Sequence, residues 1–224
     1  MIRALLAIAT LAALAPIAEA KRVCFSGPMR PQIVAAPNAK IAGSGGVIVA
    51  SGSKLPDWRF RDLNRVVRPR IVTIAPGLAI FHPPPLAGLD VVLENDAHGV
   101  IARTQRALTV DATSAAPRVR KITKATSTSR LAVMAELADT VPEHTLIIIA
   151  SRVSGDTLVP LAWTRVWKGQ SATIDVWHTP GSCEQTIDTA IEPRVGDKIV
   201  LQWVDDAGRI SEPSTAVSVT AFSR

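Results

Sequence analysis

Residues 145–150 read Thr-Leu-Ile-Ile-Ile-Ala, an almost unbroken run of β-branched and apolar side chains. A run with no alternating polar positions is typical of a strand that is fully buried at the centre of a sheet. Similar short runs, separated by turn residues, recur along the chain, for example at 46–50 (GVIVA) and 198–203 (KIVLQW). Because helical periodicity is weak nearly everywhere, we predict an all-β protein.

Seven short strands are predicted after residue 113. Only 131–137 could also be a helix, through Leu131, Met134 and Leu137, and we interpret it as a strand because its neighbours are strands. The predicted ranges are 119–122, 130–137, 145–150, 158–167, 171–177, 198–203 and 215–220. Seven strands in about 105 residues fit a seven-strand sandwich.

The first half has the same organisation of short strands and turns. Pro76-Gly77 marks a turn between two of the strands, and 111–117 (DATSAAP) is the best candidate for a linker. The predicted strands are 46–50, 58–61, 70–74, 78–81, 89–93 and 99–110. We therefore expect a domain boundary close to Ala115.

Two turn regions carry a family resemblance. Residues 80–110, with a proline cluster, Leu-Ala-Gly and a β-run, look like the last strands of bacterial immunoglobulin-like modules. Residues 204–214 (VDDAGRISEPS) resemble the final hairpin of fibronectin type III-like domains. The resemblance implies two tandem immunoglobulin-like (fibronectin type III-like) β-sandwiches, a basic one at 21–112 and a second at 113–224. The chain has no Tyr and so lacks the tyrosine corner of many such domains.

The first twenty residues have the pattern of a secretory signal peptide. Arg3 supplies the positive start, residues 4–15 are almost all apolar, and Ala18-Glu19-Ala20 fits the cleavage rule of small residues. We expect cleavage before Lys21, and no later apolar run is long enough to span a membrane. The sequence thus predicts an exported protein, periplasmic or secreted.

The two cysteines, Cys24 and Cys183, are an even pair in a chain predicted to be exported. Such a pair predicts a disulfide, which in the chain-entropy model would stabilise the fold by roughly 5 kcal/mol. The alternative is a reactive Cys183 with His178 as its base.

Positive charge is concentrated in the first half. Between Lys21 and Ala112 there are 12 Lys and Arg against 6 Asp and Glu, whereas residues 113–224 have 12 of each. Five arginines fall within twelve residues: Arg59, Arg61, Arg65, Arg68 and Arg70. All of the excess positive charge therefore lies in the first half.

Four of these arginines are candidate binding residues. In a strand, Arg59 and Arg61 share the face opposite Trp58 and Phe60, and Arg68 and Arg70 share a face. A hairpin near 62–65 could place both pairs on one surface or on two adjoining ones. Guanidinium groups suit phosphate and carboxylate, so lipopolysaccharide, anionic lipid or an acidic protein would be logical ligands, and nucleic acid a poor one after export. The alternative is a solvated face whose charges prevent aggregation.

The second candidate surface is aromatic. Trp163 and Trp167 share one face of a predicted strand, and Trp177 lies on the next strand, across a turn at 168–170. One register places Trp163 opposite Trp177 and Arg165 opposite Asp175, and a shift by two residues places Arg165 opposite Thr173. The three tryptophans would form a surface for glycan or protein, or else belong to the core with an ion pair at its rim.

No pattern for catalysis or metal binding is found in the sequence. The four histidines lack the spacing of metal ligands: they are His82, His98, His144 and His178. No nucleophile or phosphate-binding motif is present. We therefore expect no catalytic residues, metal or cofactor. The expected function is a non-catalytic binding or structural protein of the bacterial envelope. The alternatives are a periplasmic chaperone or adaptor with two immunoglobulin-like domains, or an enzyme with an unfamiliar fold.

Overall fold

The computed structural model describes most of the two predicted halves. The described residues are 32–34, 40–41, 45–50, 58–62, 65–83, 90–95, 99–106, 115–124, 131–170, 173–177 and 193–221. They form strands and turns without a helix, so the predicted all-β class is confirmed. Within these ranges no helix is long and apolar enough to cross a membrane. The predicted signal peptide, Cys24 and Cys183 lie outside the described residues.

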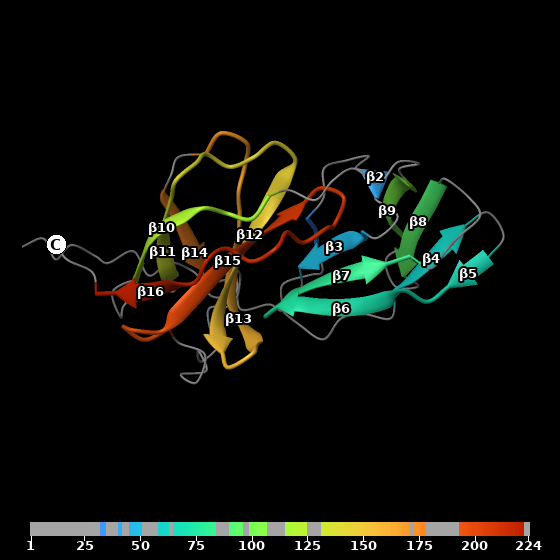
Figure 1. Cartoon of the computed structure of the whole chain (residues 1–224). Helices are drawn as coiled ribbons and strands as arrows, with labels where there is room; N and C mark the ends of the chain where they lie inside the picture. The colour runs from blue at the N-terminus through green and yellow to red at the C-terminus, as the bar shows by residue number, and fades with distance from the viewer. Residues whose placement is uncertain are drawn as a thin grey trace, which may run out of the picture.

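The described strands between residues 32 and 106 form two sheets (Figure 1). One has the order β1-β3-β7-β6 and the other the order β2-β9-β8-β4-β5, in which β2 runs parallel to β9. The strands are β1 Gln32–Ile33, β2 Lys40–Ile41, β3 Val47–Ala50, β4 Arg59–Asp62, β5 Arg65–Val67, β6 Arg70–Ala75, β7 Leu78–His82, β8 Asp90–Asn95 and β9 Gly99–Arg106.

The described strands after residue 115 form a single closed ring, at the other end of the molecule in Figure 1. The order around the ring is β10-β11-β14-β13-β12-β15-β16 and back to β10. The strands are β10 Val119–Lys124, β11 Leu131–Leu137, β12 Thr145–Ser154, β13 Thr157–Arg165, β14 Thr173–Trp177, β15 Lys198–Asp205 and β16 Val217–Thr220. All seven strands predicted in this half are present, including β11, which is a strand and not a helix.

The closure of the ring depends on two short contacts. β13 and β14 pair only at Trp163 and Trp177, and β10 pairs with β16 in parallel at two positions. The sequence predicted two separate sheets, and the structure differs because these edge strands meet over one or two residue pairs. The closed ring therefore leaves no open edge among its described strands.

The interior of the ring is a core of apolar side chains from all seven strands. Its largest side chain, Trp203, is only 3% exposed. The core residues are Ile122, Val133, Ala135, Leu137, Val141, Ile148, Ala150, Leu161, Ala162, Val166, Ile174, Val176, Ile199, Leu201, Trp203 and Val219.

In the first half, strands β3 and β7 are buried on both faces. Val47 and Val49 are buried on one face, the face of Phe81, whose ring centroid lies 5.2 Å from that of Trp58. Ile48 and Ala50 alternate with them and belong to a different apolar cluster. Burial of both faces explains why 46–50 has no polar position.

That second cluster joins the two halves of the molecule. From β12 it includes Ile147 and Ile149, which alternate with the ring-core residues Ile148 and Ala150. Its buried members are Val34, Ile48, Ala50, Ile74, Ala75, Leu78, Ile80, Ile147, Ile149, Trp163 and Val204, and we call it the shared cluster. The apolar runs GVIVA and TLIIIA thus each contribute one face to the same contact, which links sheet β1-β3-β7-β6 to the ring.

Candidate functional site at the junction of the two halves

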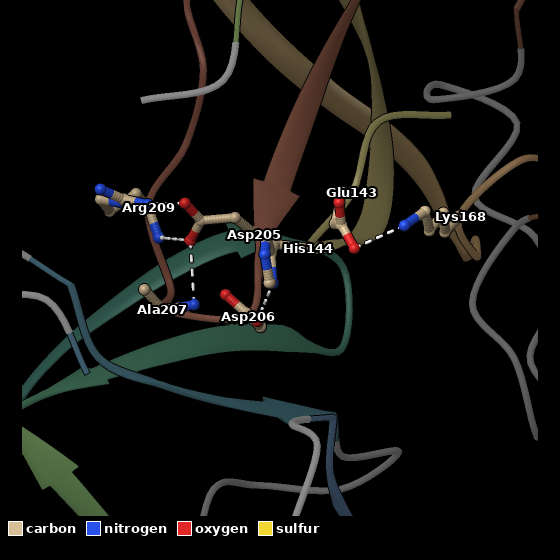
Figure 2. A network of polar contacts seen from close by, with 7 residues as sticks. All are labelled: Glu143, His144, Lys168, Asp205, Asp206, Ala207 and Arg209. Carbon is tan, nitrogen blue, oxygen red and sulfur yellow. Dashed lines mark hydrogen bonds and ion pairs between the residues drawn. The ribbon is translucent and has the colours of Figure 1, made fainter. Parts of the chain in front are cut away.

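The turn that follows β15 is held by one buried carboxylate. Asp205 is 3% exposed, and its Oδ1 accepts hydrogen bonds from the backbone N–H groups of Ala207 (3.0 Å) and Arg209 (2.9 Å). Its Oδ2 accepts from Nε of Arg209 at 2.7 Å, as Figure 2 shows. Three donors satisfy a buried charge, so this carboxylate has a structural role in shaping the turn.

The same turn touches the first half directly. The backbone N–H of Gly46 donates to the carbonyl of Ala207 at 3.1 Å, and Gly208 has φ 72°. A Cβ on Gly208 would overlap the backbone of Gly46. Glycine is therefore required at 208 both for the left-handed backbone and for the close approach of this turn to the segment at Gly46.

A second polar contact lies beside this turn. His144 has φ 64°, its carbonyl accepts from the N–H of Asp206 at 2.8 Å, and its Nδ1 lies 2.9 Å from Asp206 Oδ2. A left-handed backbone at a residue other than glycine is unfavourable, and these two contacts offset that cost. Figure 2 shows the neighbouring pair, in which Lys168 Nζ donates to Glu143 at 2.5 Å and lowers the pKa of that carboxyl, first by the hydrogen bond and then by its charge.

A groove with a volume of about 280 Å³ lies where the turn meets the first half. Its lining consists of four residues of β6 and β7 and three of the turn: Val72, Ile74, Ile80, His82, Gly208, Arg209 and Ile210. Four of these side chains are aliphatic, and the charged or titratable ones are His82 and Arg209. A further hydrogen bond between the two halves runs from Trp163 Nε1 to the carbonyl of Pro76, at 2.9 Å. The groove could hold an apolar side chain of a partner.

The predicted arginines do not share one strand hairpin. Arg59 and Arg61 lie on β4 and alternate with the buried Trp58 and Phe60, as predicted. After the β4–β5 hairpin, however, the chain changes sheets, and Arg70 begins β6, opposite His82 of β7. The hairpin that was expected to place both pairs on one surface therefore ends before Arg68. Arg61, Arg68 and Arg70 are exposed, and Arg59 is half-buried.

The predicted tryptophan surface is only partly supported. Trp163 lies opposite Trp177, which is the first of the two registers considered. Trp163 is nevertheless buried in the shared cluster, so its assignment to an exposed aromatic surface is wrong, because its face of β13 packs against the first half. Trp167, beyond the end of β13, is 64% exposed, and the side chain of Trp177 lies outside the described residues.

The two histidines that the structure describes, His82 and His144, do not form a metal-binding cluster with other described side chains. No group of three or more His, Cys, Asp or Glu side chains in the described part of the chain could hold a metal ion. His82 and His144 are at the junction, whereas His98, His178 and both cysteines lie outside the described residues. The residues that sequence reasoning missed are Gly46, His82 and Gly208. The available signals were a glycine at the start of the predicted strand 46–50 and another in the acidic turn 205–208, but neither indicates that the two segments meet.

Comparison with known proteins gives little support for any family. No protein-family model matches the chain, and no curated protein matches it. One similar solved structure is the crystal structure of chicken CNTN1 FN1-FN3 domains, with 11% sequence identity and a TM-score of 0.30. The match covers 82% of this chain and 67% of that chain.

Proposed function

We propose that this chain is an exported, non-catalytic binding or structural protein of the bacterial cell envelope, built from two tandem immunoglobulin-like β-sandwiches. The strand order of the first half supports this architecture. Named in chain order as A, A′, B, C, C′, D, E, F and G, its sheets have the orders A-B-E-D and A′-G-F-C-C′. These are the neighbour relations of immunoglobulin domains.

The ring supports the same architecture for the second half. Named A, B, C, C′, E, F and G, its strands follow the order A-B-E and then C′-C-F-G, with short contacts where the two sets meet. A sandwich whose edges touch at both sides would produce this ring. The domain limits of the proposal are those predicted from sequence, 21–112 and 113–224.

The single observation that carries the functional proposal is the shared cluster. It fixes the two halves as one body, because eleven buried apolar residues from both halves pack together. A rigid pair of sandwiches suits the presentation of a fixed binding surface. The charged groups at the junction are used in structural contacts, since Asp205 binds donors within its own turn and Asp206 contacts His144.

A second candidate, a periplasmic chaperone or adaptor, is favoured by the groove at the junction. A groove between two sandwiches could receive a segment of another polypeptide. Both candidates are binding functions, and they differ in the ligand. The first involves the exposed arginines and an anionic envelope component, and the second involves a polypeptide.

Sedimentation with lipopolysaccharide or anionic vesicles tests the first candidate. The mature protein should sediment at low salt and much less at physiological salt, because exposed charges are screened over about 8–10 Å. The variant with Gln at Arg59, Arg61, Arg68 and Arg70 should stay in the supernatant. The control variant has Gln at four exposed cations of the second half, Arg120, Lys121, Arg165 and Arg194, and should sediment like the wild type. Equal behaviour of the two variants would reject the arginine surface.

Export itself is tested by sequencing the N-terminus of protein recovered from the periplasm, which should begin at Lys21.

A further inference from the structure

Strand β6 is the longest open sheet edge among the described strands. It has six residues and pairs only with β7, whereas the other edge strands β1, β2 and β5 have two, two and three residues. An open edge presents unpaired backbone groups that can bind another extended chain. Figure 1 shows β6 along the lower border of the first half.

Two apolar side chains of β6 are also left partly uncovered. Ile71 is 43% exposed, and its neighbour Val72 on the opposite face is half-buried and lines the groove. Edge strands are commonly protected by charges, prolines or bulges. Here the bulge lies between Thr73 and Ala75, and Pro69 precedes the strand, so Arg70–Thr73 is the regular stretch.

The groove lies beside this stretch. Val72 and Ile74 of β6, together with Ile80 of β7, form its apolar lining, and the turn at Gly208–Ile210 forms the opposite side. A strand added at β6 would continue the sheet and could place alternate side chains over the groove and over Ile71. The edge and the groove thus form a single binding surface.

We propose that the β6 edge binds an extended segment of an acidic, apolar polypeptide as an added strand. The inference rests on the proposed function as a binding protein and assigns it a partner class. The backbone of Arg70–Thr73 supplies the pairing, and the groove receives an apolar side chain. Arg68 and Arg70, both exposed at the start of the edge, receive a carboxylate of the partner.

Charge distinguishes this partner from a second copy of the chain. Pairing of two β6 edges would bring Arg68 and Arg70 of both copies to one short interface, and like charges in such a position are unfavourable. In the groove Arg209 is already paired with Asp205, so the positive charge available to a partner is that of the exposed Arg68 and Arg70. An acidic segment therefore complements this surface better than a copy of it does.

The probe is a labelled eight-residue peptide of alternating Thr and Val that ends in two Asp residues, titrated against the mature protein by fluorescence anisotropy. Two further versions are N-methylated on alternate residues, one set on each edge of the peptide. If the peptide adds as a strand, one methylated version should lose binding by at least about tenfold and the other should retain it. Amide exchange at 70–73 should slow when the unmodified peptide binds.

Variants of the protein complete the test. Ile71→Lys places a charge on the edge and should weaken binding of an uncharged version of the peptide, which ends in two Asn, by at least about tenfold. Leu158→Lys, at a similarly exposed strand residue of the ring (39%), should not weaken it. Arg70→Gln should weaken binding of the acidic peptide up to about fivefold at low salt and leave a peptide ending in two Asn unchanged. Arg120→Gln is the control.

Three outcomes would overturn the proposal: equal loss for both methylated peptides, equal binding of the uncharged peptide to Ile71→Lys and wild type, or a dimer in sedimentation velocity that Ile71→Lys abolishes. The last outcome would assign the edge to a second copy. Vesicle sedimentation of Ile71→Lys distinguishes a failure of the peptide-site proposal from a failure of the proposed envelope-binding function. An unchanged salt-dependent sedimentation would retain the envelope-binding function while the peptide site is rejected.

Discussion

A glycine is needed at position 208 for two separate reasons, and the free-energy cost of each can be measured separately. Its φ of 72° is left-handed, and a Cβ at this position would also meet the backbone of Gly46. Gly155 has φ 57° and no atom within 4 Å of the place of its Cβ. Gly155→Ala should therefore cost about 1–2 kcal/mol for the backbone alone, and Gly208→Ala about 1–3 kcal/mol more, because backbone atoms must move.

Chemical denaturation of the two variants checks this prediction. Equal losses of unfolding free energy would show that the two halves do not approach each other at Gly46. A larger loss at Gly208 that disappears in a truncated second half, if that fragment folds, would assign the difference to the contact between the halves.

The pair of Glu143 and Lys168 predicts a pH effect. Lys168 holds the pKa of Glu143 below its ordinary value, chiefly through a hydrogen bond and then through its charge. A carboxyl whose pKa is lowered by folding stabilises the native state above its unfolded pKa, and this contribution is lost as the pH falls through the folded pKa. Lys168→Gln should raise the pKa of Glu143 in a carboxyl-carbon NMR titration, and Lys121→Gln should not. An unchanged pKa in Lys168→Gln would show that the pair does not form in solution.

At the scale of elements, two serine hydroxyls supply hydrogen bonds to the backbone of β15 beside the segment 211–214. The hydroxyl of Ser211 accepts from the N–H of Trp203 at 3.0 Å, and that of Ser214 accepts from the N–H of Leu201 at 2.9 Å. Both hydroxyls are thus bonded to the backbone of β15, and Pro213 between them lacks an N–H to donate. The segment 211–214 therefore covers this part of β15 through side chains and not only through a backbone ladder.

Ser214→Ala would leave the buried N–H of Leu201 without this acceptor. We expect a loss of about 1–3 kcal/mol of unfolding free energy, since a buried donor would remain unsatisfied. Ser218→Ala, at an exposed position of β16, should change the unfolding free energy by less than about 0.5 kcal/mol. Thermal or urea unfolding followed by tryptophan fluorescence compares the two, and similar losses would contradict the role assigned to Ser214.

The sequence predicts individual strands better than their partners. Alternation and turn residues place β4, β6 and β7 within a few residues of the structure, because both signals are local. The short strands β2 and β5 were not predicted, since two or three residues carry too little pattern. The sequence did not show that Arg70 lies in another sheet than Arg59 and Arg61, because no local feature marks the change of sheet after Val67.

At the scale of the whole molecule, the shared cluster was beyond sequence reasoning. GVIVA and TLIIIA each indicate a strand buried on both faces, but a pattern does not show which two faces meet. Trp163 was left open between core and surface for the same reason: its position depends on the other half of the chain. The groove follows from that docking, and the edge position of β6 follows from strand pairing, so neither could be read from a local pattern.

The predicted bridge between Cys24 and Cys183 remains a prediction from the sequence. Intact mass after alkylation without reductant should show no modified thiol in the mature protein. Reduction, or replacement of both cysteines by Ser, should lower the unfolding free energy by about 2–5 kcal/mol. Two alkylated thiols in the unreduced native protein would contradict the bridge.

The shared cluster predicts that the two halves stay together after the chain is cut between them. The linker near Ala115, which is exposed, should be the first site of limited proteolysis. After reduction, which removes any covalent link through cysteines, the two fragments of the wild type should still co-elute in gel filtration. Their contact would then depend on Ile48, Ile149, Trp163 and the other buried members of the cluster.

Ile149→Ala tests that dependence, with Ile148→Ala as the matched control. Both residues lie on β12 and are at most 2% exposed, so each truncation should cost about 2–5 kcal/mol. Only Ile149 belongs to the shared cluster, whereas Ile148 belongs to the core of the ring. Fragments of Ile149→Ala should therefore separate or bind more weakly, while those of Ile148→Ala should co-elute as long as the ring remains folded by circular dichroism. Separation of the wild-type fragments, or an initial cut within 145–150, would show that the halves do not form the rigid pair on which the proposed binding surface depends.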